Sequence, residues 1–159
     1  MINLQNVNLT GANLTGAILN GANLQGATLR NATLGGADLH EVMLNNADLH
    51  RADLHGTGLR NANLANADLT GADLSGADLT GANLSSANLQ DAILRNVVLV
   101  GADLTSANLQ NVILSNAILH WANLHNANLK SAILRNADLT GANLNGADLT
   151  DAILDNIIK

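Results

Sequence analysis

Leucine recurs at every fifth residue along the whole chain. Each of the 31 positions from Leu4 to Leu154 that are spaced by five is leucine. If leucine is position i, position i−2 is alanine at 25 of its 32 occurrences between Ile2 and Ile157. Position i−1 is Asn at 11 sites and Asp at 9, and position i+2 is Gly at 12 sites and Asn at 11. The chain is therefore one array of five-residue units, called pentads below.

A period of five excludes the two regular conformations. In an α-helix, successive leucines would be rotated by about 140° around the axis and would form no stripe. In a flat strand, an odd spacing sends successive leucines to opposite faces. Both objections disappear if the chain bends once in each pentad. The period therefore predicts short extended segments separated by corners, with every leucine pointing to the same interior.

Each position of the pentad then has a predicted role. Gly and Asn at i+2 tolerate the positive φ that many tight turns need, so they mark the corner. Alanine at i−2 faces inward and is small because the coil is thin, whereas the other three positions face solvent. Stacked coils would pair their backbones at about 4.8 Å and bury each leucine against its neighbours. Such burial contributes about 1.5–3 kcal/mol for each leucine.

The pentads resemble the pentapeptide-repeat family, whose motif is A(D/N)LXX. The segments ANLTG (12–16), ADLTG (67–71) and ADLSG (72–76) match this motif as they stand. The resemblance covers essentially the whole chain. It implies an all-β fold, a right-handed quadrilateral β-helix with four pentads in each coil and about eight coils. The frame never slips, so a single domain over residues 1–159 is expected. The absence of Phe is similar to the all-Leu members common in cyanobacteria.

The composition narrows the location and the partners. Of the 159 residues, 47% are hydrophobic but only 1% are aromatic, so the core must be narrow. There is no cysteine, which excludes disulfides. The net charge of −6 argues against direct binding of nucleic acid. The first residues, MINLQNVNLT, carry no signal-peptide pattern, and no apolar run approaches the ~18 residues of a membrane span. A cytoplasmic protein without a membrane partner is expected.

No group of side chains in the sequence indicates catalysis. Four pentads per coil place residues 20 apart in one column, so Asp68, Asp73 and Asp78 point to three different sides. No serine has a histidine and an acid arranged beside it. A convex rod also predicts no pocket. We therefore expect a non-enzymatic protein with no metal, no cofactor and no small-molecule substrate. The histidines, which splay outward in this arrangement, are His40, His50, His55, His120 and His125.

Hydrophobic residues at i−1 are the most informative departure from the motif. The stacking predicts one column of isoleucines on the last four coils, and the adjacent side adds further apolar residues. Because contiguous exposed apolar patches often mark interfaces, this pattern predicts a protein partner or a homodimer through the C-terminal half. The alternative is that isoleucine merely suits a half-covered β position. The candidate interface residues are Ile93, Ile113, Ile133, Ile153, Val98, Val100, Ile118, Trp121, Ile157 and Ile158.

The C-terminus offers a second route to association. The last residues, DAILDNIIK, stay in register and leave no segment for a capping helix. An uncapped last coil with Leu154 would expose backbone groups that invite pairing with another chain. We expect end-to-end pairing there or lateral pairing through the isoleucines.

Acidic residues in the first half allow a different function. The family includes DNA mimics that inhibit gyrase and confer quinolone resistance, as well as regulators of cyanobacterial differentiation. Interspersed Arg30, Arg51 and Arg60 favour a structural role for the Asp and Asn side chains, which would hydrogen-bond the local backbone. We expect the protein to act as a structural or protein-interaction solenoid, and a regulatory role is one version of this function. The alternative is a DNA-mimic inhibitor of gyrase. The alternative acidic surface comprises Asp38, Glu41, Asp48, Asp53, Asp68, Asp73 and Asp78.

One pentad, residues 57–61, departs more than any other from the motif. Thr57 places a hydroxyl in the core, where it needs a hydrogen-bond partner. Gly58 has no side chain at the outward i−1 position. Together they predict a local bulge rather than a site.

Overall fold

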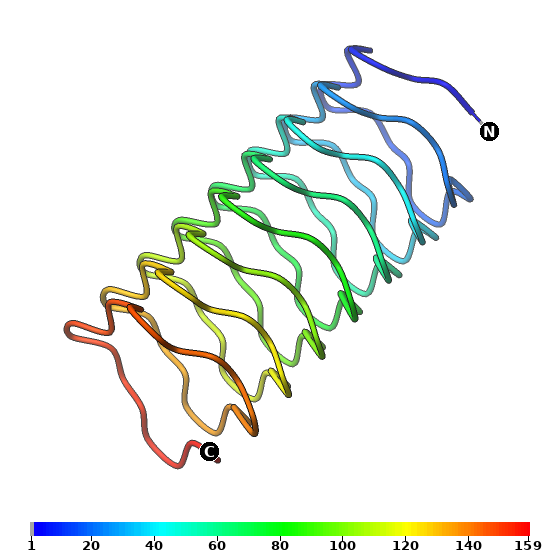
Figure 1. Cartoon of the computed structure of the whole chain (residues 1–159). Coiled ribbons are helices and arrows are strands. Elements are labelled where there is room, and N and C mark those ends of the chain that lie inside the picture. The colour runs from blue at the N-terminus through cyan, green and yellow to red at the C-terminus, as the bar shows by residue number, and fades with distance from the viewer. Residues whose placement is uncertain (1) are drawn as a thin grey trace.

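The computed structural model describes residues 2–159, which wind as stacked coils along one axis, with the two termini at opposite ends of a rod (Figure 1). These residues contain no helix and no strand longer than a single bridge residue. The bridge residue is position i−1 of each pentad, from Asn3 to Ile158. The chain is thus an all-β helix, as predicted.

The coils stack in a constant register. Every β-bridge within residues 2–159 is parallel and joins residues 20 apart, such as Asn3 with Asn23. Paired residues are therefore four pentads apart, which confirms the stacking expected from the sequence. The i−1 residues form four columns, called first to fourth below. They begin at Asn3, Asn8, Asn13 and Ile18 respectively.

Backbone hydrogen bonds use four of the five N–H groups of a typical pentad. Around Leu79, the N–H groups of Leu79 and Gly81 donate to the next coil at 2.7 and 2.9 Å. The N–H of Asp78 donates to the previous coil at 3.0 Å, and that of Ala82 donates to the Leu79 carbonyl at 3.0 Å. The fifth N–H, at position i+1, takes no part in this backbone network.

Each corner is a turn with a positive φ at i+2. This holds at all i+2 positions, from Asn6 (57°) to Asn156 (55°), and twelve of them are glycine. The N–H of the next alanine position donates to the leucine carbonyl three residues earlier. A positive φ at the third residue together with this hydrogen bond is the pattern of a type II turn. The predicted corner role of Gly and Asn is confirmed.

Leucine and the i−2 residues fill the interior. Every leucine from Leu24 to Leu134 exposes 1% or less of its surface. At the two ends, Val7 and Ile157 occupy the i−2 position and pack inward against the core. Ile157, predicted as an interface residue, is therefore part of the closing layer of the core and only partly exposed.

The unusual pentad at residues 57–61 keeps the regular register. The Thr57 hydroxyl is buried and donates to the Leu54 carbonyl at 2.8 Å, so it has the partner that it needs. Gly58 pairs with both Asp38 and Asp78, and the predicted bulge is therefore wrong. Its missing side chain instead leaves room for the His40 imidazole, which a Cβ at Gly58 would meet.

Candidate interaction surface

Asp and Asn at i−1 complete the backbone network. The Oδ1 atom of each of these 20 side chains accepts a hydrogen bond from the N–H two residues later, at 2.9–3.3 Å. The donor is the i+1 N–H that the backbone leaves unused. This arrangement is an Asx turn repeated along the rod. The structural interpretation of the Asp and Asn columns is confirmed.

Asparagine side chains also connect neighbouring coils. At the corner between the third and fourth columns, the Asn116 amide donates to Asn96, Asn136 to Asn116, and Asn156 to Asn136, each at 3.2 Å. These bonds run along the edge of the isoleucine column. Together they form a continuous ladder of asparagine hydrogen bonds beside the isoleucines.

Isoleucine replaces Asp and Asn in the C-terminal half of the third column. Ile93, Ile113, Ile133 and Ile153 pair with one another in consecutive coils and are called the Ile stripe below. All four side chains are half-buried. In the fourth column, Val98 pairs with Ile118, which exposes 38% of its surface. The predicted stacking of the stripe is confirmed.

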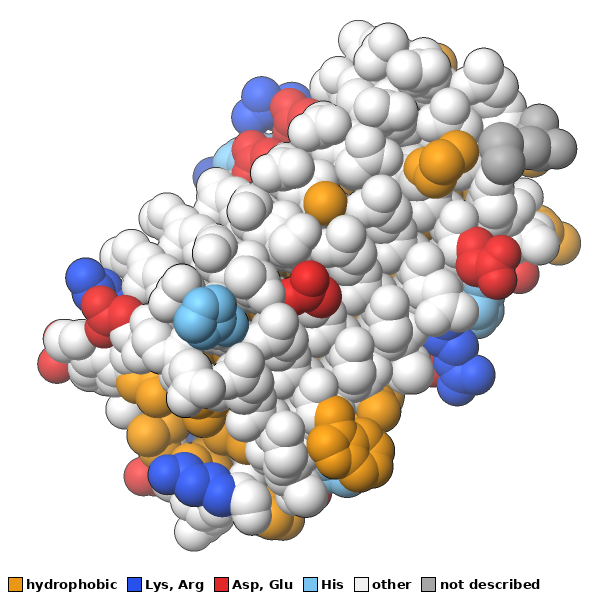
Figure 2. Space-filling view, in the orientation of Figure 1, with side chains coloured by type: hydrophobic (Ala, Val, Ile, Leu, Met, Phe, Trp, Pro, Cys, Tyr) orange, Lys and Arg blue, Asp and Glu red, His pale blue; other side chains and the backbone are white. Residues whose placement is uncertain are grey.

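The fourth column is less uniform than the Ile stripe. Asp138 separates Ile118 from Ile158, which exposes 55% of its surface. Val100 lies at i+1 of the same column and is half-buried. The space-filling view shows hydrophobic side chains gathered toward the C-terminal end of the rod (Figure 2). The continuous part of this apolar surface is therefore the stripe.

Each isoleucine of the stripe gives up an Asx turn. The i+1 N–H groups of Arg95, Ser115, Arg135 and Asp155 have no acceptor within residues 2–159. An intramolecular hydrogen bond contributes about 0.5–1.5 kcal/mol, and the whole range of β-propensity spans only about 1 kcal/mol. The loss of one offsets the gain of the other, so the isolated rod gains little from isoleucine here.

Trp121 stands at a corner next to the fourth column. It exposes 67% of its surface and has a φ of 54°, a conformation that bulky residues rarely adopt. Its ring meets the His120 ring edge to face, with centroids 5.7 Å apart. Gly141, at the same corner one coil later, leaves the room that the indole occupies. The exposed indole thus lies against the corner of the next coil, in space that a larger residue than glycine would fill.

His120 also links Trp121 to an acid. Its Nε2 lies 2.8 Å from the Asp138 carboxylate and is buried, although the N–H is not aligned for a straight hydrogen bond. The Thr140 hydroxyl and the His120 imidazole lower the pKa of Asp138 to about 2. Asp138 is therefore ionised at neutral pH and lies close to the imidazole that meets the indole.

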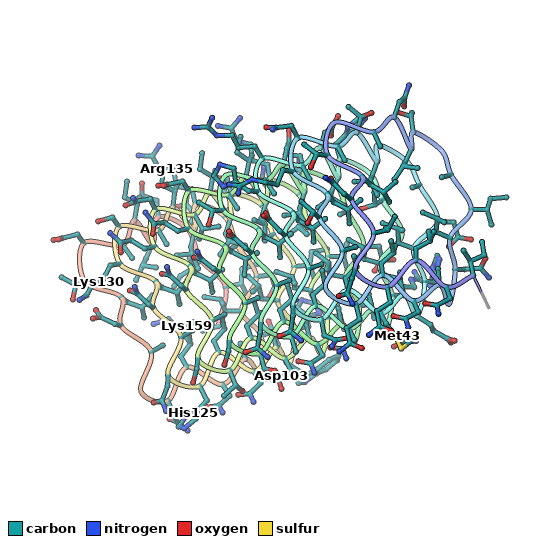
Figure 3. All side chains as sticks on the ribbon, turned by 90° about the horizontal axis from the view of Figure 1, so that it is seen from above. Met43, Asp103, His125, Lys130, Arg135 and Lys159 are labelled. Atoms are coloured by element: carbon teal, nitrogen blue, oxygen red, sulfur yellow. The ribbon has the colours of Figure 1, made fainter. Side chains whose placement is uncertain are left out.

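The first column has a different character. Figure 3 shows Met43, Asp103 and His125 along one long side of the rod, with Arg135 on the opposite side. Met43 and Asp103 belong to the first column, His125 lies at i+1 beside that column, and Arg135 lies at i+1 beside the Ile stripe. Beyond Met43, the first column carries only Asn and Asp. The rod is therefore amphipathic across its width in the C-terminal half.

The acidic residues of the N-terminal half are spread around the rod. No single column carries more than two of the seven acids of the predicted acidic surface. Asp48 and Asp68 lie in the second column, Asp53 and Asp73 in the third, Asp38 and Asp78 in the fourth, and Glu41 at a corner.

Basic side chains pair with four of these acids. Arg30 lies 3.3 Å from Asp48, and Arg60 lies 2.6 Å from Asp78. His40 bonds Asp38 and lowers the pKa of that carboxyl. The Asp53 carboxylate, 2.6 Å from the His55 ring, raises the pKa of the imidazole. The two arginines therefore offset part of the negative charge of the surface.

Residues 2–159 contain no metal-binding cluster, no pocket and no membrane-spanning helix. Within residues 2–159 no cluster of three or more His, Asp or Glu side chains has a geometry that suits a metal ion. The surface of this part of the chain also has no pocket. None of its segments is a helix long and apolar enough to cross a bilayer.

The five-residue repeats identify the family of the chain. A family model described as pentapeptide repeats matches in eight copies, over residues 2–36, 22–61, 47–85, 58–96, 82–120 and 117–156. The chain belongs to the pentapeptide-repeat family. No protein of curated function matches it.

Solved pentapeptide-repeat proteins are similar over most of the chain. HetL, involved in heterocyst differentiation regulation in the cyanobacterium Nostoc, is 37% identical over 98% of this chain and 88% of its own, with a TM-score of 0.45. Rfr23 from the cyanobacterium Cyanothece is 28% identical over 87% and 88%, with a TM-score of 0.32. Trypsin-treated QnrB1, a plasmid-mediated fluoroquinolone resistance protein, is 18% identical over 96% and 77%, with a TM-score of 0.66. QnrB1 therefore shares the fold.

Departures from the motif distinguish one pentapeptide-repeat rod from another. Two apolar departures at i−1 were not pointed out in the sequence analysis. Ile18 exposes 74% of its surface at i−1 of the first coil, and Met43 interrupts the first column. Both are visible in the sequence as apolar residues at i−1. Each pairs only with polar residues in the adjacent coils, Ile18 with Asp38 and Met43 with Asn23 and Asn63, and neither extends the Ile stripe.

Proposed function

We propose that this protein is a non-enzymatic interaction scaffold that binds protein through the apolar surface of its C-terminal half. In this proposal the chain forms one domain over residues 1–159, a right-handed quadrilateral β-helix of about eight coils. It works in the cytoplasm and uses no cofactor, nucleic acid or small-molecule substrate. The surface comprises the Ile stripe with Val98, Val100, Ile118, Trp121 and Ile158.

The Ile stripe is the observation that carries this proposal. Four consecutive coils place isoleucine where 20 other pentads place Asp or Asn. Each of these isoleucines leaves an N–H without its Asx acceptor and keeps half-exposed apolar surface. Contiguous apolar surface of this kind marks binding sites for other molecules, and an exposed tryptophan is a suitable anchor. Burial of this apolar surface against a partner would offset the hydrogen bonds that the isoleucines lack.

The proposed role is regulatory. HetL, 37% identical, is described as involved in the regulation of heterocyst differentiation. A convex rod without a pocket in residues 2–159 can influence another protein by occupying its surface, rather than by converting a substrate. Regulation by contact fits both observations.

A DNA-mimic inhibitor of gyrase is the rival function and has weaker support. A mimic of duplex DNA needs closely spaced negative charges along one face, because DNA carries a charge every ~1.7 Å. Here six of the seven acids are divided among three columns and the seventh lies at a corner. Arg30 and Arg60 form ion pairs with two of them, and His40 and His55 hydrogen-bond two more. The likeness to QnrB1, at 18% identity, concerns the fold alone.

Photo-crosslinking tests the proposed surface. Ser115 and Gln110 both lie at i+1 and are both half-buried, but Ser115 flanks the Ile stripe whereas Gln110 belongs to the second column. A photoreactive amino acid placed at Ser115 should give a discrete crosslinked product in an extract of the source cells. The matched variant at Gln110 should not. Equal products at both positions, or none at Ser115, would contradict the proposal.

A further inference from the structure

We infer that the Ile stripe binds a second copy of this chain, which lies alongside the first with its axis antiparallel. This inference rests on the proposed function and names the partner for the stripe. The apolar residues of the fourth column are not needed for it.

The axial period of the stripe restricts what can lie on it. Its isoleucines recur once per coil, at the β-stacking distance of about 4.8 Å. A peptide strand laid along the rod repeats its side chains every 6.6–6.8 Å on one face, so it falls out of step within two or three coils. A second rod of the same construction has the same period and stays in step over all four isoleucines. A copy of this chain meets that condition and presents an identical apolar stripe.

Charges favour an antiparallel pair over a parallel one. The arrangement is centred between Ile113 and Ile133, so Ile93 of one copy faces Ile153 of the other. In the adjacent i+1 row, Arg95 then faces Asp155. Arg95 has no ion pair within residues 2–159. Asp155 pairs with Arg135 of its own chain at 3.1 Å but keeps 64% of its side chain exposed. The antiparallel pair therefore gives Arg95 an acidic partner, which it shares with Arg135 of the other copy.

A parallel pair would be less favourable. It would place the Asp73 residues of the two copies opposite each other at the same height of the third column, one coil before Ile93. The antiparallel pair directs each acidic N-terminal half beyond the stripe of the other copy. One unfavourable approach remains, between Asp91 and Asp151 at the far corner, where Asn111 already hydrogen-bonds Asp91.

The local structure offers a variant that removes the stripe without disturbing the fold. Asparagine is the commonest residue at i−1, and every such Asn accepts the i+1 N–H. The double variant I113N/I133N should restore Asx turns to Ser115 and Arg135. At a protein concentration too low for dimers to form, it should unfold at a urea concentration no lower than that of the original protein. Ile18→Asn makes the same change outside the stripe and is the matched control.

Sedimentation velocity tests the inference on the intact chain. At ~100 μM, well above the micromolar dissociation constants of ordinary interfaces, the protein should sediment as a species of twice 16.4 kDa. I113N/I133N should sediment as a monomer, and Ile18→Asn as the dimer. A monomeric original protein would overturn the inference, and so would a dimer that survives in I113N/I133N.

Crosslinking tests the orientation, because the chain has no cysteine. Packed sheets lie about 10 Å apart, so a bismaleimide of about 8 Å spans facing positions. Ile93→Cys and Ile153→Cys should give a dimer when the two variants are mixed, but not when either is treated alone. Products from each variant alone would indicate parallel pairing and overturn the antiparallel arrangement.

The outcomes also separate this inference from the proposed function. If the purified chain is monomeric but Ser115 crosslinks to a different protein in extract, the proposed function stands and the inference fails. If Ser115 gives no product in extract and the chain is monomeric, both fail.

Discussion

At the scale of the residue, position i−1 is where the local fold and the surface compete. Asp73 shows the role in the fold: its Oδ1 accepts the Ser75 N–H at 2.9 Å. Ile93, one coil later in the same column, gives up this bond and presents apolar surface. The backbone is the same at both sites. The rod can therefore change its surface at i−1 at a cost of about one hydrogen bond for each residue.

Asp73 provides a test of the Asx turn. Asp73→Ala should lower the free energy of unfolding by about 0.5–1.5 kcal/mol, because the Ser75 N–H loses its acceptor. Asp73→Asn keeps an acceptor oxygen and should lose less. Urea denaturation of both variants measures the difference. Equal losses would show that the charge, and not the hydrogen bond, stabilises this position.

At the scale of the element, the corner determines which residues each pentad tolerates. All the i+2 residues have positive φ, yet they include Trp121 and Arg51 as well as glycine. The left-handed conformation costs an ordinary residue about 1–2 kcal/mol. A bulky residue at a corner is therefore a local cost that contacts elsewhere must offset. For Trp121, those contacts include His120 and the clearance above Gly141.

Gly76 allows the cost of the corner to be measured without a packing change. Its φ is +68°, and an added Cβ would meet nothing within 4 Å. Gly76→Val should lower the free energy of unfolding by about 1–2 kcal/mol from backbone strain alone. Gly76→Asn should cost less, because Asn tolerates this conformation. Denaturation midpoints compare the two, and a valine variant as stable as the asparagine variant would contradict the role of φ.

At the scale of the whole molecule, ion pairs connect adjacent coils, but hydrogen-bonded carboxyls make the rod sensitive to acid. Arg60 with Asp78, Lys130 with Asp148, and Arg135 with Asp155 each link one coil to the next. These pairs are largely exposed, and single exposed pairs contribute little to stability. The pKa values of the carboxyls of Asp38 and Asp148 are nevertheless lowered, by the hydrogen bonds of His40 and of Thr150 respectively.

Asp138 should make a measurable contribution to acid denaturation. Its pKa falls from 3.8 to about 2 on folding, because the Thr140 hydroxyl and the His120 imidazole bind the ionised form. A group whose pKa is lower in the folded state stabilises the protein above pH 3.8. That contribution disappears as the pH falls from 3.8 through about 2. The urea midpoint should therefore drop over this range.

Asp138→Asn is the control for the acid effect. The amide does not titrate but keeps an acceptor for the Thr140 N–H, so the midpoint of this variant should depend less on pH between 4 and 2. An identical pH dependence in both proteins would assign the acid sensitivity to the other carboxyls.

The sequence was sufficient for the backbone but not for the surface contacts. A strict period of five determines which residues lie inside and which ones stack, so the leucine core, the corners and the Ile stripe were all predictable. The orientation of a surface side chain depends on neighbours 18 to 20 residues away. The bulge predicted at Gly58 failed for this reason, because nothing in its pentad shows that His40 fills the space. The neutralisation of Asp78 by Arg60 was hidden in the same way.

The constant 20-residue register gives insertions and deletions a definite phase. Removing a whole coil shortens the rod and leaves every column downstream in line. Removing one pentad leaves every leucine inside but moves all later residues by one column. The Ile stripe would then continue the column of Asp48 and Asp68 rather than that of Asp53 and Asp73. An insertion or deletion of five residues therefore rotates the surface downstream of it by one side of the rod relative to the surface upstream, while the core stays the same.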